Sequence, residues 1–330
     1  MHISRRALLG SMACLVGRPR AEAASESVRE RNFELQYESS LNNIPVGAEH
    51  FKFWMPVAHA DTFQKIELLD VEAPVPYSME TGANGDRILY IGKAPTGADR
   101  LRVKLRFRVS RRERMVRTVS TGTGSASLTE QQRSRYLQPD RLVPLDDTIR
   151  KWAREVVDTA NARMDLEKAR AIYNHVVATV KYDKTGKGWG RGDIYYACEN
   201  RRGNCTDFHA IFIGYARAVD VPARFTIGFP VPAQRGEGRI AGYHCWAEFF
   251  AAGVGWVPVD ASEAAKDPSR REYFFGALDE NRIEFSRGRD LVLNPPQQAE
   301  PLNYFIFPYA EIEGKPQAEI ETTVSYRDLA

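Results

Sequence analysis

The spacing at which apolar residues recur changes once along this chain, and that change limits the folds it can adopt. Residues 101–109 alternate apolar and basic side chains without interruption, which is the two-residue period of a half-buried strand. Beyond Asp146, apolar residues recur every three or four positions, in 149–160 and again in 166–180, as in amphipathic helices. We therefore expect a β-sandwich domain over residues 30–120, followed by an α+β domain.

The second part of the chain is expected to alternate helices and strands. After the segment 166–180, for which Asp165 is the expected N-cap, a third helix is predicted over 205–219 with Asn204 as its N-cap. The strands that we expect after this helix are 223–228, 243–250 and 256–260.

Composition shifts set the domain boundaries. Residues 118–128 are rich in Ser, Thr and Gly, which is typical of a connecting segment. The predicted order is an N-terminal segment, the sandwich, a linker, the α+β domain and a C-terminal extension, with bounds of 1–23, 30–120, 121–140, 141–310 and 311–330.

The N-terminus is typical of an export signal. Arg5 and Arg6 precede a short apolar stretch, and Ala21-Glu22-Ala23 resembles a cleavage site. The adjacent arginines favour a twin-arginine type of signal. We therefore expect an exported protein, periplasmic or extracellular, and we expect no transmembrane segment because no later apolar run approaches the length of a membrane span.

Charge argues against a nucleic-acid partner. The net charge is +3, but without residues 1–23 the chain carries 42 basic and 42 acidic residues. Nucleic-acid-binding proteins usually keep a basic excess. With 43% hydrophobic and 27% charged residues, the composition is that of an ordinary globular protein.

One cysteine occupies a position that favours reactivity. Cys205 follows Asn204 at the start of the predicted third helix, where the free N–H groups and the helix dipole stabilise a thiolate. Removal of the signal leaves three cysteines, an odd number. One open alternative is a disulfide between Cys198 and Cys245 that leaves Cys205 free.

A histidine and an aspartate follow on expected strands. The alternation of residues 243–250 places His244, Trp246 and Glu248 on one face. A glycine-bearing turn then leads into 256–260, so that a hairpin can bring Asp260 beside His244. Imidazole activates a thiol nucleophile, and a carboxylate orients the imidazole.

Three segments together resemble the bacterial transglutaminase-like superfamily: GNCTDFHAIFIGYARAVDVPARFTIGF from Gly203, GYHCWAEFF from Gly242 and GWVPVDASEA from Gly255. The resemblance implies a papain-like fold in which a helix bearing the cysteine packs on an antiparallel sheet bearing the histidine and the aspartate. It implies Cys205 as nucleophile, His244 as general base and acid, and Asp260 as the orienting group.

Other residues are candidates for supporting roles. The indole N–H of Trp189 is a candidate oxyanion donor, with a lid or core aromatic as the alternative. Asn204, Tyr243 and Trp246 complete the candidate oxyanion or substrate-binding set. His209, four residues after Cys205, lacks a standard zinc spacing, so we expect neither a metal nor a cofactor.

These features predict a thiol enzyme that cleaves or transfers acyl groups of amide bonds through a thioester. Hydrolysis is favoured over crosslinking because water needs no second binding site. The expected partners are peptides or proteins, including peptidoglycan stem peptides. The alternative is a catalytically silent binding or scaffold module of the cell envelope.

Overall fold

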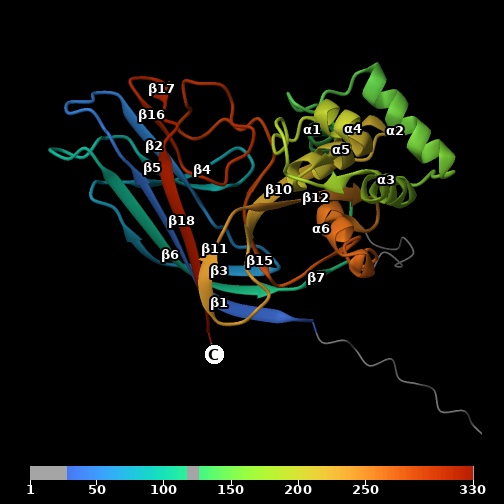
Figure 1. The fold of residues 1–330 in the computed structure, drawn as a ribbon, viewed down its shortest axis with the longest axis horizontal. Coiled ribbons are helices and arrows are strands. Elements are labelled where there is room, and N and C mark those ends of the chain that lie inside the picture. Colours follow the sequence, from blue (N-terminus) through green and yellow to red (C-terminus); the bar gives the residue numbers. More distant parts are fainter. Residues whose placement is uncertain (1–27, 117–125, 330) are drawn as a thin grey trace, which may run out of the picture.

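The structure, a computed structural model, describes residues 28–116 and 126–329. The predicted signal peptide and residues 117–125 of the Ser/Thr/Gly-rich segment lie outside these ranges. Figure 1 shows long strands on one side of the molecule and helices on the other. We call these two parts the sandwich and the helical half. No helix within the described ranges is long and apolar enough to cross a membrane.

The sandwich consists of two five-stranded antiparallel sheets, with strand orders β11-β18-β1-β6-β3 and β17-β16-β2-β5-β4. Their strands are β1 (Glu30–Leu41), β2 (Phe51–Val57), β3 (Gln64–Glu72), β4 (Ser78–Thr81), β5 (Arg87–Ile91), β6 (Leu101–Arg112), β11 (Glu237–Ile240), β16 (Tyr309–Ile312), β17 (Lys315–Pro316) and β18 (Ile320–Asp328). The alternation in β6 is confirmed: the side chains of Leu101, Phe107 and Val109 are buried, whereas those of Arg102 and Arg108 are exposed. The buried face packs into a core shared with β2 and β5.

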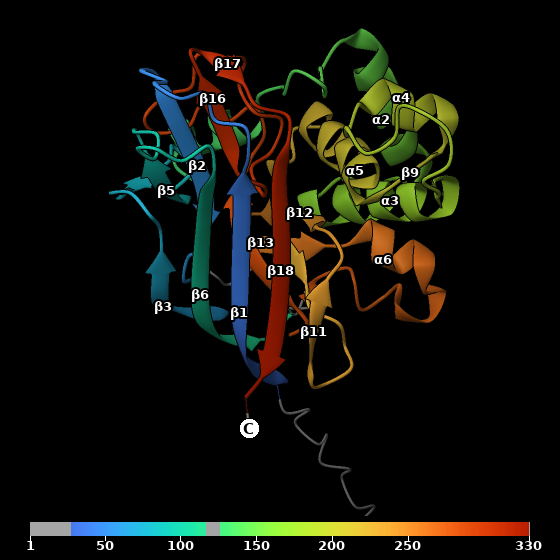
Figure 2. The same cartoon turned by 60° about the vertical axis from the view of Figure 1, so that its left-hand side comes forward.

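The C-terminal residues complete the sandwich. Strand β18 pairs with β1 along its length, from Phe33 opposite Asp328 to Leu41 opposite Ile320. Strand β16 pairs with β2 in the second sheet. Figure 2 shows β18 between β1 and β11. Residues 311–330, expected as an extension, therefore supply strands to a domain that begins almost 300 residues earlier.

The helical half surrounds a four-stranded antiparallel sheet with the order β13-β12-β10-β15. These strands are β10 (Ala223–Pro230), β12 (His244–Ala251), β13 (Gly255–Val259) and β15 (Arg282–Arg287). The helices are α1 (Glu130–Tyr136), α2 (Asp147–Thr159), α3 (Asp165–Thr179), α4 (Ile194–Asn200), α5 (Cys205–Ala218) and α6 (Ala261–Lys266), with a 3₁₀ turn at Pro268–Arg270. Two-residue strands join loops: β7 (Arg114–Met115) with β14 (Ala277–Leu278), and β8 (Lys181–Tyr182) with β9 (Arg202–Gly203).

Two local details differ from expectation. Helix α1 lies inside the expected linker, where Thr129 caps it through its side chain. Helix α3 has Met164 rather than Asp165 as its N-cap residue. The prediction was wrong there because the Glu167 carboxylate accepts the Met164 N–H (3.1 Å), which moves the start of the helix back by one residue.

Helix α5 forms the centre of the helical half. All its residues, from Cys205 to Ala218, are buried. A helix without a solvent-facing side must be enclosed by other elements, and α2, α3, α4 and β12 all pack against it. The first turn of α5 is thereby held rigidly against the end of the sheet.

Buried ion pairs link two strands of the helical half's sheet to Arg114, which lies two residues after the end of β6. Glu248 on β12 is fully buried between Arg224, whose Nε donates to it (2.7 Å), and Arg114. Burial favours the neutral acid, but the two guanidinium groups outweigh it and lower the pKa of Glu248. The carboxylate therefore stabilises the fold at neutral pH, and this contribution is lost as acidification protonates it.

Glu248→Gln is expected to destabilise the protein strongly. The substitution leaves two cations facing each other in the interior, which typically costs about 3–5 kcal/mol. Urea unfolding followed by circular dichroism measures the change. Glu38→Gln, which removes a carboxylate from an exposed pair with Arg102 (2.8 Å), is the matched control and should leave the midpoint nearly unchanged. Equal midpoints for the two variants would contradict this account.

Candidate active site

Cys205 is the first residue of α5, and its position depends on the cap before it. The Asn204 side-chain oxygen accepts the Thr206 N–H (3.0 Å), and the Asp207 carboxylate accepts the Asn204 N–H (2.9 Å). This reciprocal capping box confirms Asn204 as the N-cap. The Cys205 thiol therefore lies at the positive end of the helix dipole, where negative charge is stabilised.

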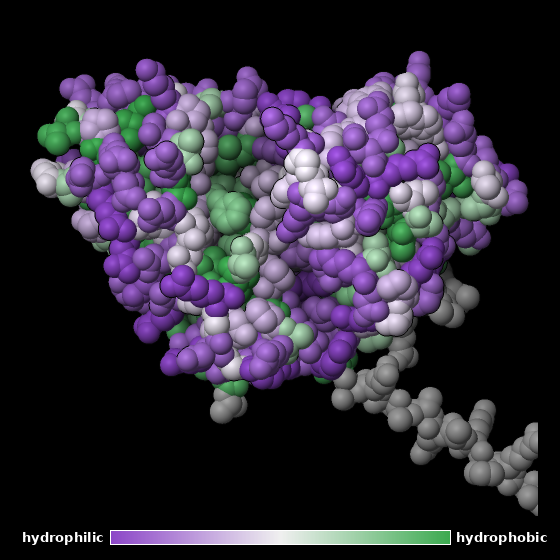
Figure 3. All heavy atoms as spheres, in the orientation of Figure 1, coloured by the Kyte–Doolittle hydropathy of each residue, from purple (hydrophilic) through white to green (hydrophobic). Residues whose placement is uncertain are grey.

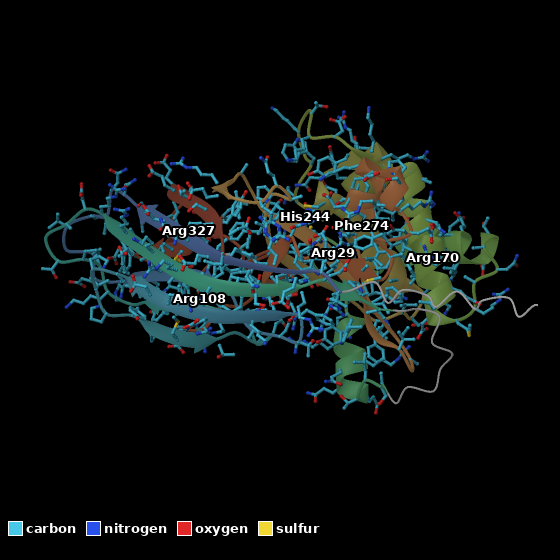
Figure 4. The ribbon with its side chains drawn as sticks, turned by 90° about the horizontal axis from the view of Figure 1, so that it is seen from below. Arg29, Arg108, Arg170, His244, Phe274 and Arg327 are labelled. Atoms are coloured by element: carbon cyan, nitrogen blue, oxygen red, sulfur yellow. The ribbon has the colours of Figure 1, made fainter. Side chains whose placement is uncertain are left out.

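His244 and Asp260 come from neighbouring strands. His244 begins β12, and Asp260 follows β13 and caps α6. The His244 Nε2 donates to Asp260 Oδ2 at 2.7 Å. Since Nε2 faces the carboxylate, Nδ1 is the ring nitrogen left for another partner. Figure 4 shows His244 where the strands of the sandwich meet the helices.

The Cys205 thiol and the His244 ring interact and shift each other's pKa. Burial alone raises the pKa of the thiol, but the Cys245 thiol and His244 outweigh it and hold that pKa well below its usual range. Burial lowers the pKa of His244, whereas Asp260 and Cys205 raise it, to about 10 overall. The arrangement therefore favours a thiolate beside an imidazolium at neutral pH.

Four donors fix the Asp260 carboxylate. Besides His244, Oδ2 accepts from Arg282 Nη1 (3.0 Å), while Oδ1 accepts from the Ser262 hydroxyl and the Glu263 N–H, both at 3.0 Å. Burial opposes the ionised form, but His244 and Arg282 hold the pKa of Asp260 well below its usual range. Sequence reasoning missed Arg282, because no local pattern marks a residue that reaches the site from β15.

A second cysteine and histidine lie beneath this group. The Ala261 N–H donates to His209 Nε2 (3.2 Å), so the proton of the neutral ring is on Nδ1, which lies 3.7 Å from the Cys245 Sγ. Burial lowers the pKa of His209 and thus favours its neutral form. His209 is therefore a neutral, hydrogen-bonded residue of α5.

The cysteines that the structure describes are unpaired. Cys198 on α4 lies 3.5 Å from the Tyr215 hydroxyl, whereas Cys245 contacts His209. The disulfide between Cys198 and Cys245 that the sequence left open is therefore not formed. Burial raises the pKa of Cys198 to about 11, so this thiol is a poor nucleophile at neutral pH.

The candidate supporting residues fall into two groups. Asn204 and Tyr243 lie together, because the Asn204 Nδ2 donates to the Tyr243 hydroxyl (3.1 Å). Two residues lie differently from our expectation. The indole N–H of Trp189 donates to the Gly186 carbonyl (3.2 Å), which occupies the donor that an oxyanion would need. Trp246 is fully buried beneath the Arg282 guanidinium, 5.2 Å from its ring centre, and so has no face open to a substrate.

Three residues that the sequence did not single out form one side of the site. The Lys266 ammonium donates to Glu263 (2.6 Å) and lies 3.9 Å from the centre of the Tyr182 ring. Glu263 in turn lies 3.9 Å from His244 Nε2. Glu263 therefore borders the histidine, and through it a partly exposed cation and an aromatic ring lie at the edge of the site.

The surface is hollowed along the boundary between the two halves, as Figure 3 shows. A separate cavity of about 710 Å³ lies among α2, α3, α4 and α5, and Trp152, His175 and Cys198 are among its lining residues. That cavity does not include Cys205, His244 or Asp260, so it is distinct from the candidate triad. Within residues 28–116 and 126–329, no cluster of three or more His, Cys, Asp or Glu residues is arranged to hold a metal ion.

Comparison with known proteins agrees with this fold. Residues 150–261 match the family model of the transglutaminase-like superfamily. A solved structure of a proposed cysteine protease from Cytophaga hutchinsonii has a TM-score of 0.61 at 16% identity, covering 92% of each chain. The periplasmic domain of TgpA from Pseudomonas aeruginosa has a TM-score of 0.41 at 16% identity, covering 73% of this chain and 90% of that one.

A sequence relative extends the comparison along the chain. An uncharacterized protein of Haemophilus influenzae is 25% identical over 311 residues, which is 83% of this chain and 84% of the relative. Residues 150–261 thus form a transglutaminase-like domain, and the chain has an α+β, papain-like core. The predicted fold class is confirmed, and a function of the thiol-enzyme type is supported.

Proposed function

We propose that Cys205, His244 and Asp260 form the catalytic triad of a thiol enzyme that acts on amide bonds. The observation that carries this proposal is the 2.7 Å contact between His244 Nε2 and Asp260, which leaves the other ring nitrogen for a thiol at a helix N-terminus. Nucleophile, base and orienting group thus lie on three rigid elements, as such catalysis requires.

The reaction divides into two halves. The Cys205 thiolate attacks the amide carbonyl, and the His244 imidazolium protonates the nitrogen that leaves as an amine, so that a thioester remains. Neutral His244 then takes a proton from water or from an acceptor amine, which attacks the thioester and releases the thiolate. We assign the Cys205 N–H and the second N–H of Asn204 Nδ2, beside the one that donates to Tyr243, as donors to the oxyanion.

Within this proposal, hydrolysis is favoured over crosslinking, because water needs no binding site of its own. Peptides or proteins are the proposed substrates. Action in the periplasm or outside the cell, including on peptidoglycan stem peptides, is proposed from the N-terminal sequence alone. Acyl transfer to an amine follows the same chemistry, so the products distinguish the two outcomes.

The experiment compares wild type with Cys205→Ala on casein, with and without a labelled primary amine. New peptide ends that depend on Cys205, without amine incorporation, are expected for hydrolysis. Cys205-dependent incorporation would instead mean a transamidase. If neither product, nor ammonia release, distinguished the two proteins, the proposed activity on protein amides would be wrong.

One observation favours the alternative of a silent binding module. Cys205 is only 2% exposed and His244 only 6%. A substrate can therefore reach them only if some of the residues that cover them move aside. A silent module has no need of a reactive thiol, and its cysteine should have the ordinary thiol pKa of about 8.5.

The pH dependence separates the two functions. Because the pKa of Cys205 is lowered, its thiolate persists well below pH 8.5; because the pKa of His244 is raised to about 10, its imidazolium persists up to that pH. We expect Cys205 alkylation by iodoacetamide to remain fast at neutral pH. The turnover rate should follow a broad bell-shaped pH profile that falls on its basic side near pH 10. An alkylation rate that rises only around pH 8.5 would favour the silent module.

A further inference from the structure

The loop before α4 crosses the N-terminus of α5 in an unusual conformation. Gly186, Gly188, Gly190 and Gly192 all have positive φ, from 63° to 97°. The approach is close: a Cβ on Gly192 would lie 3.1 Å from the Thr206 carbonyl, and one on Gly190 would lie 3.4 Å from Asn204 Nδ2. We call residues 186–192 the glycine loop. A chain so rich in glycine has many conformations available, so external contacts must select this one.

Asp207 holds the N–H groups of the glycine loop. This residue of α5 is fully buried, and its carboxylate accepts from Gly190 N–H (2.7 Å) and Gly192 N–H (3.0 Å) in addition to the Asn204 N–H of the capping box. Burial raises the pKa of Asp207, although these amides counteract it. A capping box needs only one of these contacts, so the other two serve the loop.

Arg289 holds the carbonyl groups of the same loop. Arg289 is only 8% exposed, and its guanidinium donates to the Gly192 carbonyl (2.8 Å) and the Arg191 carbonyl (3.0 Å). The Asn303 Nδ2 also donates to the Arg191 carbonyl (2.8 Å), while its oxygen accepts from Arg289 Nε (3.0 Å). The loop is thus fixed from both sides, by a carboxylate on its amides and by a guanidinium on its carbonyls.

The location of Asp207 does not suit thiol activation. A negative charge two residues from Cys205 disfavours a thiolate, so this carboxylate works against the nucleophile electrostatically. Its geometric effect is different, because it joins the glycine loop, the Asn204 cap and the first turn of α5 in one rigid unit. Rate in acyl transfer depends strongly on how well the reacting groups are oriented.

We propose that Asp207 and Arg289 are positioning residues that hold the glycine loop as the wall of the acyl-donor subsite beside Cys205. This inference rests on the proposed function, since it concerns the binding of the substrate whose amide Cys205 attacks. We call Asp207 and Arg289 together the clamp. The clamp affects the rate of acylation because it positions the glycine loop and the Asn204 side chain, and it does not make the thiol reactive.

Asp207→Asn tests this inference. Asparagine keeps the shape but turns one accepting oxygen into a donor that faces backbone N–H groups. We expect kcat for a peptide amide to fall by about 10- to 100-fold, with iodoacetamide alkylation of Cys205 unchanged or faster. Hydrogen exchange should show lost protection at Gly190 and Gly192. Asp146→Asn, at the N-cap of α2, is the matched control and should retain wild-type kcat.

Arg289→Lys provides an independent variant in case Asp207→Asn does not fold. Lysine keeps the charge, but its single ammonium nitrogen cannot reproduce the planar guanidinium that donates to the Gly192 and Arg191 carbonyls from two nitrogens. We therefore expect a similar loss of kcat with unchanged alkylation of Cys205. Wild-type kcat in either folded variant, or equal losses of kcat and alkylation, would overturn the inference. Wild type could show no Cys205-dependent turnover while Asp207→Asn still lost hydrogen-exchange protection at Gly190 and Gly192. In that case the proposed function would be wrong, but the role of Asp207 in holding the loop would stand.

Discussion

Cys205→Ala is expected to lower turnover of a protein amide by at least about 10⁴-fold, because removal of the nucleophile of a triad leaves only binding and oxyanion contributions. The thiol is the reacting atom in both halves of the proposed mechanism, so hydrolysis and amine transfer should be lost together. Initial rates of new amino ends and of amine incorporation measure the effect.

Cys198→Ala is the matched control for this substitution. Cys198 lies on α4 beside Tyr215, and burial raises its pKa to about 11, so its removal should leave the rate close to that of wild type. Loss of activity in Cys198→Ala with activity retained in Cys205→Ala would place the nucleophile elsewhere.

Asp260→Asn is expected to lower kcat by about 10²- to 10⁴-fold, the range that follows when a triad histidine loses its orienting carboxylate. Asp260 holds His244 through Nε2 at 2.7 Å and raises the pKa of the imidazole. Without that charge the imidazolium loses its proton at lower pH. The basic limb of the pH profile should therefore move from near pH 10 toward neutrality.

The stability of this variant must be measured beside its rate. Arg282 donates to Asp260 from a buried position and also pairs with Asp279 (3.4 Å). The substitution therefore removes one of the two carboxylates that balance this buried cation, and it should lower the unfolding midpoint. Rates are therefore compared at a temperature where circular dichroism shows both proteins folded. Asp267→Asn, at the cap of the 3₁₀ turn, is the control that should retain activity. An unchanged basic limb in Asp260→Asn would argue against the His244–Asp260 pair.

The sequence predicted those features that depend on neighbours in the chain. The start of α5 follows from Asn204 and the apolar residues after Cys205, and the buried face of β6 follows from its strict alternation. The approach of Asp260 to His244 follows from one short turn between two strands. In each case a local period or a cap determines the geometry.

Features that depend on distant segments could not be predicted in this way. The pairing of β18 with β1 joins the two ends of the chain, and no local pattern specifies which strand lies beside which. Arg282 and Arg289 reach their partners across the fold. The Trp189 indole donates within its own loop, because glycines with positive φ bend that loop back on itself.

Trapping of the acyl-enzyme tests the central claim most directly. Wild type is mixed with an activated ester of a short acyl-peptide, quenched in acid after milliseconds to seconds, and analysed by intact mass and peptide mapping. The account predicts one added acyl group, carried as a thioester on Cys205 and released by hydroxylamine, with slower formation in Asp260→Asn. An acyl group on Cys198 or Cys245, or steady turnover without any adduct, would contradict it.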